Sequence, residues 1–257
     1  MTASFDAVAE LTKTFSLLFQ KKNWMLAVPL LIGTLVAVAV VGLTFVLALG
    51  PAIATAIYGG ASGSMSSPAA LLPALLGVGG LLVLIGVLVA FVIAMFTYGW
   101  AYAAAAPMWG GGDPDISGGF NKAMAKLGPL VVLGLIVAVV IGLLGWTVIV
   151  PILAGLFCLY CLPYIMMANE SGTGAISASI KLSRENFGPT AMLFLGFIVV
   201  GVASGIINMV LGVVPLLGHI LGLGVNALVA AYLTLATIRF YSLLTGSAAA
   251  APAAPTA

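Results

Sequence analysis

Charged residues are scarce in this sequence. Of its 257 residues only 5% are Asp, Glu, Lys or Arg, whereas 63% are hydrophobic, and the mean hydropathy is +1.30. A soluble domain carries about 25% charged residues, so this chain has too little charge to cover a surface in water. Eight Lys and Arg against six Asp and Glu leave a formal charge of +2, which is too small to indicate nucleic-acid binding. The composition therefore predicts an integral membrane protein.

Cysteine and histidine are nearly absent. Two Cys and one His exclude a disulfide framework and leave too few ligands for a metal cluster. Cys158 and Cys161 form a C-x-x-C within an apolar run, where a metal would need two more ligands and a redox pair would need exposure to water. We interpret both as small apolar residues. No cleavable signal peptide is expected, because an amphipathic stretch rather than a short basic one precedes the first apolar run.

The few charges are confined to short parts of the chain. They fall within residues 6–22, 113–126 and 170–185 and at Arg239. The charge-free runs between them cover residues 23–112, 127–169 and 186–238. Because about 20 helical residues cross a bilayer core about 30 Å thick, the second and third runs each hold two spans. The first also holds two, since its Gly-, Ser- and Pro-rich stretch over 50–70 predicts a loop.

The fold class that follows is an all-α, polytopic membrane protein with six spans. We predict transmembrane helices near residues 24–49, 77–106, 129–149, 151–168, 189–213 and 217–243. Three hairpins return every charged segment to the same side of the membrane. The positive-inside tendency places that side and both termini in the cytoplasm. We therefore expect a multi-pass protein of the bacterial cytoplasmic (inner) membrane, with the lipid bilayer as its first partner.

A short amphipathic helix is predicted before each hairpin. Apolar residues recur at helical spacing at Phe5, Val8, Leu11, Phe15 and Leu18, again at Ile116, Phe120, Met124 and Leu127, and again at Ile176, Ile180 and Phe187. Such helices lie at the membrane interface, with the apolar face among the headgroups.

The hairpins also resemble an internal repeat within a single membrane domain over residues 1–246. The breaks after the amphipathic helices are expected at 21–23, 128–129 and 188–189, and the outer turns at 50–51, 150–151 and 214–215. The repeat units are approximately 3–106, 113–168 and 174–245. The Ala/Pro-rich tail over 247–257 is predicted to be disordered.

The polar segment over 169–189 lies between two apolar runs and carries Glu170, Lys181, Arg184 and Glu185. Arg184 and Glu185 are sequence neighbours and point apart on a helix. Arg239, at the inner end of the last helix, could pair with Glu185 or Glu170 and clamp this segment to the bundle. Alternatively, Lys181 and Arg184 could bind anionic lipid headgroups. Both interpretations stay open at this point.

Two amides and the single histidine fall in the last hairpin. At about 1.5 Å per residue, Asn208 and Asn226 lie roughly 9 Å and 14 Å below the outer turn, so a hydrogen bond across the hairpin is expected. A substrate site is the alternative. His219, at the outer turn, could be an axial ligand of a haem or chlorophyll metal, but we favour an interfacial residue in contact with water. No bound cofactor is otherwise predicted.

Two small-x-x-x-small patterns occupy the same hairpin, Gly201 with Gly205 and Gly218 with Gly222. Small residues at this spacing allow two helix backbones to approach closely. We expect packing within the chain first and an oligomer interface second.

The stretch TVIVPILAGLFCLYCLPYIMMANESGTGAISASIKLSRENFGPTAMLFLGF resembles the multi-helix membrane domain attached to some bacterial glycerophosphodiester phosphodiesterases, and that domain's free-standing six-helix relatives of unknown function. The matching positions are Pro151, Pro163, Glu170, Ala175, 180–183, Asn186 and the span from Met192. The resemblance covers roughly residues 110–245 and is weaker before them. Its motifs are architectural, so it implies a six-helix membrane fold and no particular activity.

Three functional classes compete. A non-catalytic structural or accessory protein, which packs against lipid, other subunits or a second copy, is favoured. Lipid handling or small-molecule transport is the alternative, although coupled transporters usually keep an ionisable residue within a span and here each lies at or outside a helix end. An enzyme is the weakest interpretation, because no nucleophile-base pair, acid pair or metal set is present.

Overall fold

The computed structural model describes residues 5–20, 22–60, 77–147, 149–214 and 217–246. Within them the regular elements are all helical. Six helical segments are long and apolar enough to cross a membrane: Asn23–Gly50, Gly79–Gly110, Leu127–Thr147, Ile149–Met167, Phe187–Leu211 and Leu217–Thr245. The six predicted spans are confirmed, with ends shifted by a few residues. The chain is a multi-pass, all-α membrane protein.

Three short helices precede the three hairpins, as predicted; they are α1 (Ala7–Leu18), α5 (Ile116–Ala125) and α9 (Gly172–Glu185). The hairpins are formed by α2 (Ala27–Gly60) with α4 (Val78–Ala105), by α6 (Leu127–Leu144) with α7 (Ile149–Phe157) and α8 (Cys161–Met167), and by α10 (Phe187–Leu211) with α11 (Leu217–Thr245). Short 3-10 turns complete the chain at η1 (Asn23–Leu26), η2 (Ala106–Gly110) and η3 (Gly145–Thr147).

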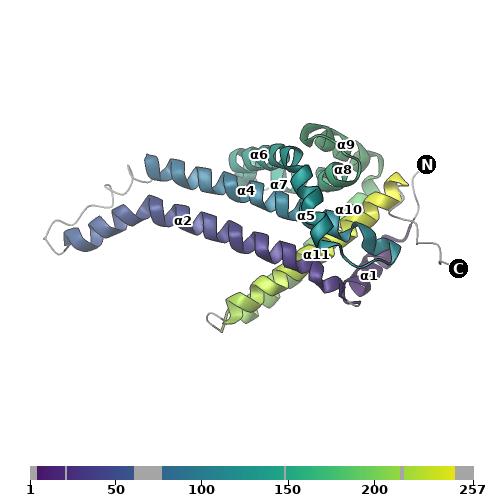
Figure 1. Cartoon of the computed structure of the whole chain (residues 1–257), viewed down its shortest axis with the longest axis horizontal. Helices are drawn as coiled ribbons and strands as arrows, with labels where there is room; N and C mark the ends of the chain where they lie inside the picture. The colour runs from purple at the N-terminus through teal and green to yellow at the C-terminus, as the bar shows by residue number, and fades with distance from the viewer. Residues whose placement is uncertain (1–4, 21, 61–76, 148, 215–216, 247–257) are drawn as a thin grey trace.

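The three short helices gather at one end of the molecule, which we call the charged end (Figure 1). From this end the α2–α4 hairpin extends in one direction and the α10–α11 hairpin in another, so their outer halves diverge. At the charged end α1 packs across α11, α5 packs on α4, and α9 packs on α6, α7 and α8. The C-terminal half of α11 forms the centre of the core, where Leu235, Ile238 and Phe240 are fully buried.

Side-chain caps start each of the short helices. Asp6, Asp115 and Ser171 accept backbone N–H groups of the first turn at 2.9 to 3.1 Å. These bonds satisfy donors that have no partner within the helix. A single non-helical residue, Lys126 or Asn186, then separates α5 from α6 and α9 from α10. The polar connection between interfacial helix and span is therefore short and well ordered.

Two of the predicted outer turns are wrong. Gly50 and Pro51 lie within α2, which continues to Gly60, so the loop expected from residue 50 begins at least ten residues later. A proline in the interior of a long helix removes one backbone donor and can kink the helix without ending it. Pro151 lies in the first turn of α7, where a missing N–H is tolerated, and the chain reverses earlier, around η3.

Some expectations lie outside what the structure describes. Pro215 of the third outer turn, the remainder of the first outer loop over 61–70 and the tail over 247–257 are all outside the described residues. The single-domain boundaries and the internal repeat stay predictions.

The fourth span is not the continuous helix that was predicted over 151–168. It is divided into α7 and α8, and Cys158, Leu159 and Tyr160 form a break between them. A break at this depth leaves backbone groups without helical partners, and such groups need partners from elsewhere in the protein. The structure supplies them from α9.

Candidate functional site

Serine side chains of α9 bond the backbone at the break between α7 and α8. Ser179 Oγ donates to the carbonyl of Phe157 at 2.7 Å and accepts from the N–H of Tyr160 at 3.1 Å. Ser183 Oγ lies 3.5 Å from the carbonyl of Leu156. Both serines are fully buried. The short helix α9 therefore holds the fourth span in its broken form.

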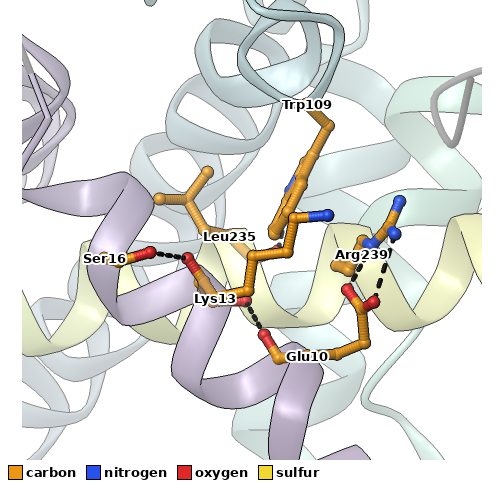
Figure 2. Close-up of polar contacts among 7 residues, drawn as sticks. Glu10, Lys13, Ser16, Trp109, Leu235 and Arg239 are labelled. Atoms are coloured by element: carbon orange, nitrogen blue, oxygen red, sulfur yellow. Dashed lines mark hydrogen bonds and ion pairs between the residues drawn. The ribbon is translucent and has the colours of Figure 1, made fainter. Parts of the chain in front are cut away.

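A mostly buried ion pair joins the first and last helices at the charged end. Arg239 Nε donates to Glu10 Oε2 at 2.6 Å and Nη2 to Oε1 at 3.3 Å, and the two side chains are only 12% and 19% exposed. The guanidinium carbon lies 4.9 Å from the ring centroid of Trp109, whose Nε1 donates to the carbonyl of Leu235 at 3.2 Å. Figure 2 shows this arrangement between α1, η2 and α11.

The partner predicted for Arg239 is wrong. The structure pairs Arg239 with Glu10 rather than with Glu185 or Glu170, because α1 crosses α11 and brings the Glu10 carboxylate to it. Glu185 instead lies 4.0 Å from Lys181 in an exposed pair one turn apart on α9.

The predicted headgroup residues of α9 lie on its exposed side. Lys181 and Arg184 line a shallow surface pocket together with Ser177, Ile180 and Glu185. Binding of lipid headgroups by Lys181 and Arg184 stays a prediction.

An apolar cavity of about 530 Å³ lies among α4, α6, α7, α8, α9, α10 and α11. Its polar groups are few: the hydroxyls of Tyr98, Tyr102 and Thr234 and the thiol of Cys158. The remaining wall is aliphatic and aromatic, with Met95, Ile136, Val137, Val140, Ile141, Pro151, Ala154, Gly155, Leu159, Leu162, Ile176, Phe197 and Leu233. The cavity borders the break in the fourth span, since Cys158 and Leu159 belong to both.

The hydrogen bond predicted across the last hairpin is present. Asn208 Nδ2 donates to Asn226 Oδ1 at 2.9 Å, and Ser204 Oγ donates to the same oxygen at 2.9 Å. Gly222 lies directly against this cluster, because a Cβ there would overlap Asn208 Oδ1. These three polar residues and the glycine join α10 to α11 in the part of the hairpin that diverges from the bundle. Their arrangement is that of a helix-helix contact.

The two small-residue patterns have different surroundings. A Cβ at Gly218 would overlap the backbone carbonyl of Leu211, so Gly218 and Gly222 allow the close approach of α10 and α11. By contrast, Gly201 and Gly205 meet nothing within 4 Å. Packing within the chain is thus confirmed for the Gly218–Gly222 pair, and Gly201 and Gly205 lie on an open helix face.

His219 and the two cysteines are not brought together. His219 is exposed in the first turn of α11, whereas the free thiol Cys158 lies in the helix break and the free thiol Cys161 begins α8. In the described part of the chain no group of three or more His, Cys, Asp or Glu side chains is placed to hold a metal ion. An axial-ligand role for His219 stays a prediction.

Three features were missed by the sequence analysis: the Glu10 carboxylate, the Ser179 cap and the cavity. A signal existed for Ser179. Ala175, Ser179 and Ser183 recur every four residues on the side of α9 away from its charges, as a buried helix face does. No local signal marks Glu10, because its partner is 229 residues away.

The resemblance to the membrane domain of some bacterial glycerophosphodiester phosphodiesterases stays a prediction. Comparisons of the chain with protein-family models, with curated proteins and with solved structures found no match.

Proposed function

We propose that this integral membrane protein is non-catalytic and holds a lipid chain or a similarly apolar molecule within its bundle. The observation that carries the proposal is the cavity of about 530 Å³. Binding sites for small molecules commonly measure about 300–1,000 Å³, with apolar walls and a few polar groups. The cavity matches this description and lies among candidate membrane spans.

The chemistry of the wall favours a hydrophobic occupant. The tyrosines Tyr98 and Tyr102 suit the ester or hydroxyl group of a lipid, and the remainder suits a hydrocarbon chain. The Thr234 hydroxyl already donates to the carbonyl of Ala230 at 2.8 Å. A ligand that is already dissolved in the bilayer reaches such a site without crossing water. The wall carries no charged side chain, so it can orient a ligand but offers no charged group for acid-base chemistry. This is why we propose binding rather than catalysis.

Filling the cavity tests the proposal. Ala154 lines the cavity on α7, and Leu153 is its exposed neighbour on the same helix. We expect Ala154→Phe to reduce the lipid retained through purification in mild detergent by about tenfold, measured by native mass spectrometry. Leu153→Phe is the matched control and should retain wild-type amounts. Equal lipid content in wild type and folded Ala154→Phe protein would rule out the cavity as the binding site.

An accessory subunit is the second candidate, favoured by one observation on the α10–α11 hairpin. Asn226 is exposed within a candidate span, and in the described part of the chain its Nδ2 donates no hydrogen bond. An unpaired amide in hydrocarbon is costly, and a helix of another membrane protein would supply an acceptor. If this is correct, the wild-type protein should purify with a partner at fixed stoichiometry, and the Asn226→Leu variant should purify without it. Purification of the wild type without one would count against it.

We also propose that the charged end faces the cytoplasm of a bacterial inner membrane. The support is the concentration of Lys and Arg in the segments that gather there. In intact cells, an impermeant maleimide should label Val213→Cys and should label Lys181→Cys only after permeabilisation. The unsubstituted protein gives the background from Cys158 and Cys161. Labelling of Lys181→Cys in intact cells would reverse the orientation.

A further inference from the structure

A second pocket, of about 240 Å³, lies at the charged end between α1, η2 and α11. Its polar lining consists of Lys13, Ser16, Gln20, Trp109 and Arg239. It shares no residue with the apolar cavity. The two pockets also differ in chemistry, because the second is lined by cationic and amide side chains.

The charges around this pocket do not balance. Glu10 compensates Arg239 through two hydrogen bonds, whereas Lys13 forms no ion pair with any residue that the structure describes. Counting Lys13 and Arg239 against Glu10 leaves one positive charge. Figure 2 shows the Lys13 side chain extending toward Trp109, on the same side of α1 as the ion pair. The unpaired ammonium group therefore lies at the pocket that Arg239 and Trp109 also line.

Several donors remain for an incoming anion. The Lys13 ammonium group has three N–H bonds, and the Gln20 amide has two. Arg239 directs Nε and Nη2 at Glu10, which leaves N–H groups of the guanidinium unused. Ser16 is occupied, since its hydroxyl donates to the carbonyl of Lys13 at 2.8 Å. A tetrahedral oxyanion such as a phosphate group accepts several charge-assisted hydrogen bonds of this kind.

The position of α1 places this pocket at the depth of lipid headgroups. Val8, Phe15 and Phe19 lie on one face of α1 and are exposed, as expected of a helix that dips its apolar face into the membrane. Lys13 lies five residues after Val8 and two before Phe15, which at about 100° per residue places it on the opposite side of α1, and Gln20 follows the C-terminal end of the helix. They therefore project toward the headgroup layer rather than into the hydrocarbon.

We propose that this pocket binds a phosphate group, with Lys13 as the principal cation and Gln20 and Arg239 as further donors. The phosphate belongs either to an anionic phospholipid headgroup or to a free phosphate compound. The site does not depend on occupation of the apolar cavity. Trp109 and the Arg239–Glu10 pair give the pocket a fixed wall, so that only the Lys13 side chain needs to be ordered on binding.

Substitution of Lys13 tests the proposal without disturbing the core, because the residue is exposed. Wild-type protein and variants in neutral detergent are titrated separately with short-chain phosphatidylglycerol, short-chain phosphatidylcholine and inorganic phosphate. We expect Lys13→Gln to weaken phosphatidylglycerol binding by about fivefold, since one Lys near an anionic surface contributes about 1 kcal/mol. Lys13→Arg should recover most of the affinity. Lys122→Gln, at an exposed position of α5, is the matched control and should bind as the wild type does.

The outcomes separate the two sources of phosphate and separate this site from the cavity. Lys13-dependent binding of phosphatidylglycerol alone supports a headgroup site, and Lys13-dependent binding of inorganic phosphate supports a site for the free anion. Equal affinities of wild type and Lys13→Gln for both probes overturn the proposal. Ala154→Phe should leave the Lys13-dependent binding intact. Loss of phosphatidylglycerol binding in Ala154→Phe but not in Lys13→Gln would assign the lipid to the cavity alone.

Discussion

The charged end of the molecule and the outer halves of its two long hairpins are built differently. At the charged end, residues from distant parts of the sequence contact one another, and α11 is buried there, with Ile238 and Phe240 fully enclosed. In the outer half of α10 most side chains are exposed, and Met209 reaches 81%. There α10 contacts mainly its own hairpin partner, as Figure 1 shows for the diverging hairpins.

This difference indicates where the fold is determined. Apolar side chains that face lipid gain little from packing against one another, because lipid tails are equally apolar. Polar contacts therefore decide the geometry, and they concentrate at the charged end: the Arg239–Glu10 pair, the Ser179 cap and the Trp109 bond. In the outer halves, as far as the structure describes them, one such cluster lies around Asn226. Lipid or another protein must cover the rest.

Breaking the ion pair should have the largest effect. Glu10→Gln leaves the mostly buried Arg239 without its counter-charge, and we expect a loss of about 3 kcal/mol in the free energy of unfolding. Titration with a denaturing detergent, followed by circular dichroism, measures it. Glu185→Gln is the control, because its pair with Lys181 is exposed and is expected to contribute less than about 0.5 kcal/mol. Similar stabilities for the two variants would refute the proposed importance of the charged end.

Removing the cap on the broken span should have the next largest effect. Ser179→Ala leaves the carbonyl of Phe157 and the N–H of Tyr160 without the hydroxyl that bonds them. An unsatisfied buried polar group costs about 1–3 kcal/mol, so we expect a loss of about 2 kcal/mol in the same assay. Ser177→Ala provides the comparison, since the Ser177 hydroxyl bonds only within α9, on its exposed side. If both variants unfold alike, α9 does not support the break.

The positions of the spans were predictable because charge cannot be placed in hydrocarbon at low cost. The charge-free runs alone located six helices, and the short polar segments located α1, α5 and α9. Proline was less informative. Pro151 was assigned to a turn but lies in the first turn of α7, since a proline near a helix start is compatible with either position.

The candidate sites were predictable only where the partners are close along the chain. Asn208 and Asn226 were paired correctly because a hairpin places residues at similar depths opposite each other. Arg239 was not, because its partner depends on how α1 crosses α11, and no periodicity encodes a crossing of two distant helices. The cavity depends on the packing of seven helices and on the break at Cys158, which the continuous apolar sequence of the fourth span conceals.

A substitution in the outer half of the α10–α11 hairpin should have the smallest effect on global stability, and it compares the two regions of the molecule directly. Asn208→Leu removes the amide that bonds Asn226 across the hairpin, and contacts of this kind average about 0.6 kcal/mol in membranes. We expect a global stability loss below about 1 kcal/mol. Faster amide hydrogen exchange should appear in the outer halves of α10 and α11, whereas residues 227–245 should exchange as in the wild type, because their core contacts are unchanged. Met209→Leu, a substitution on the exposed face, should alter neither. If exchange instead accelerates throughout α11, the two regions unfold as one unit and the polar cluster of the outer hairpin supports the whole bundle.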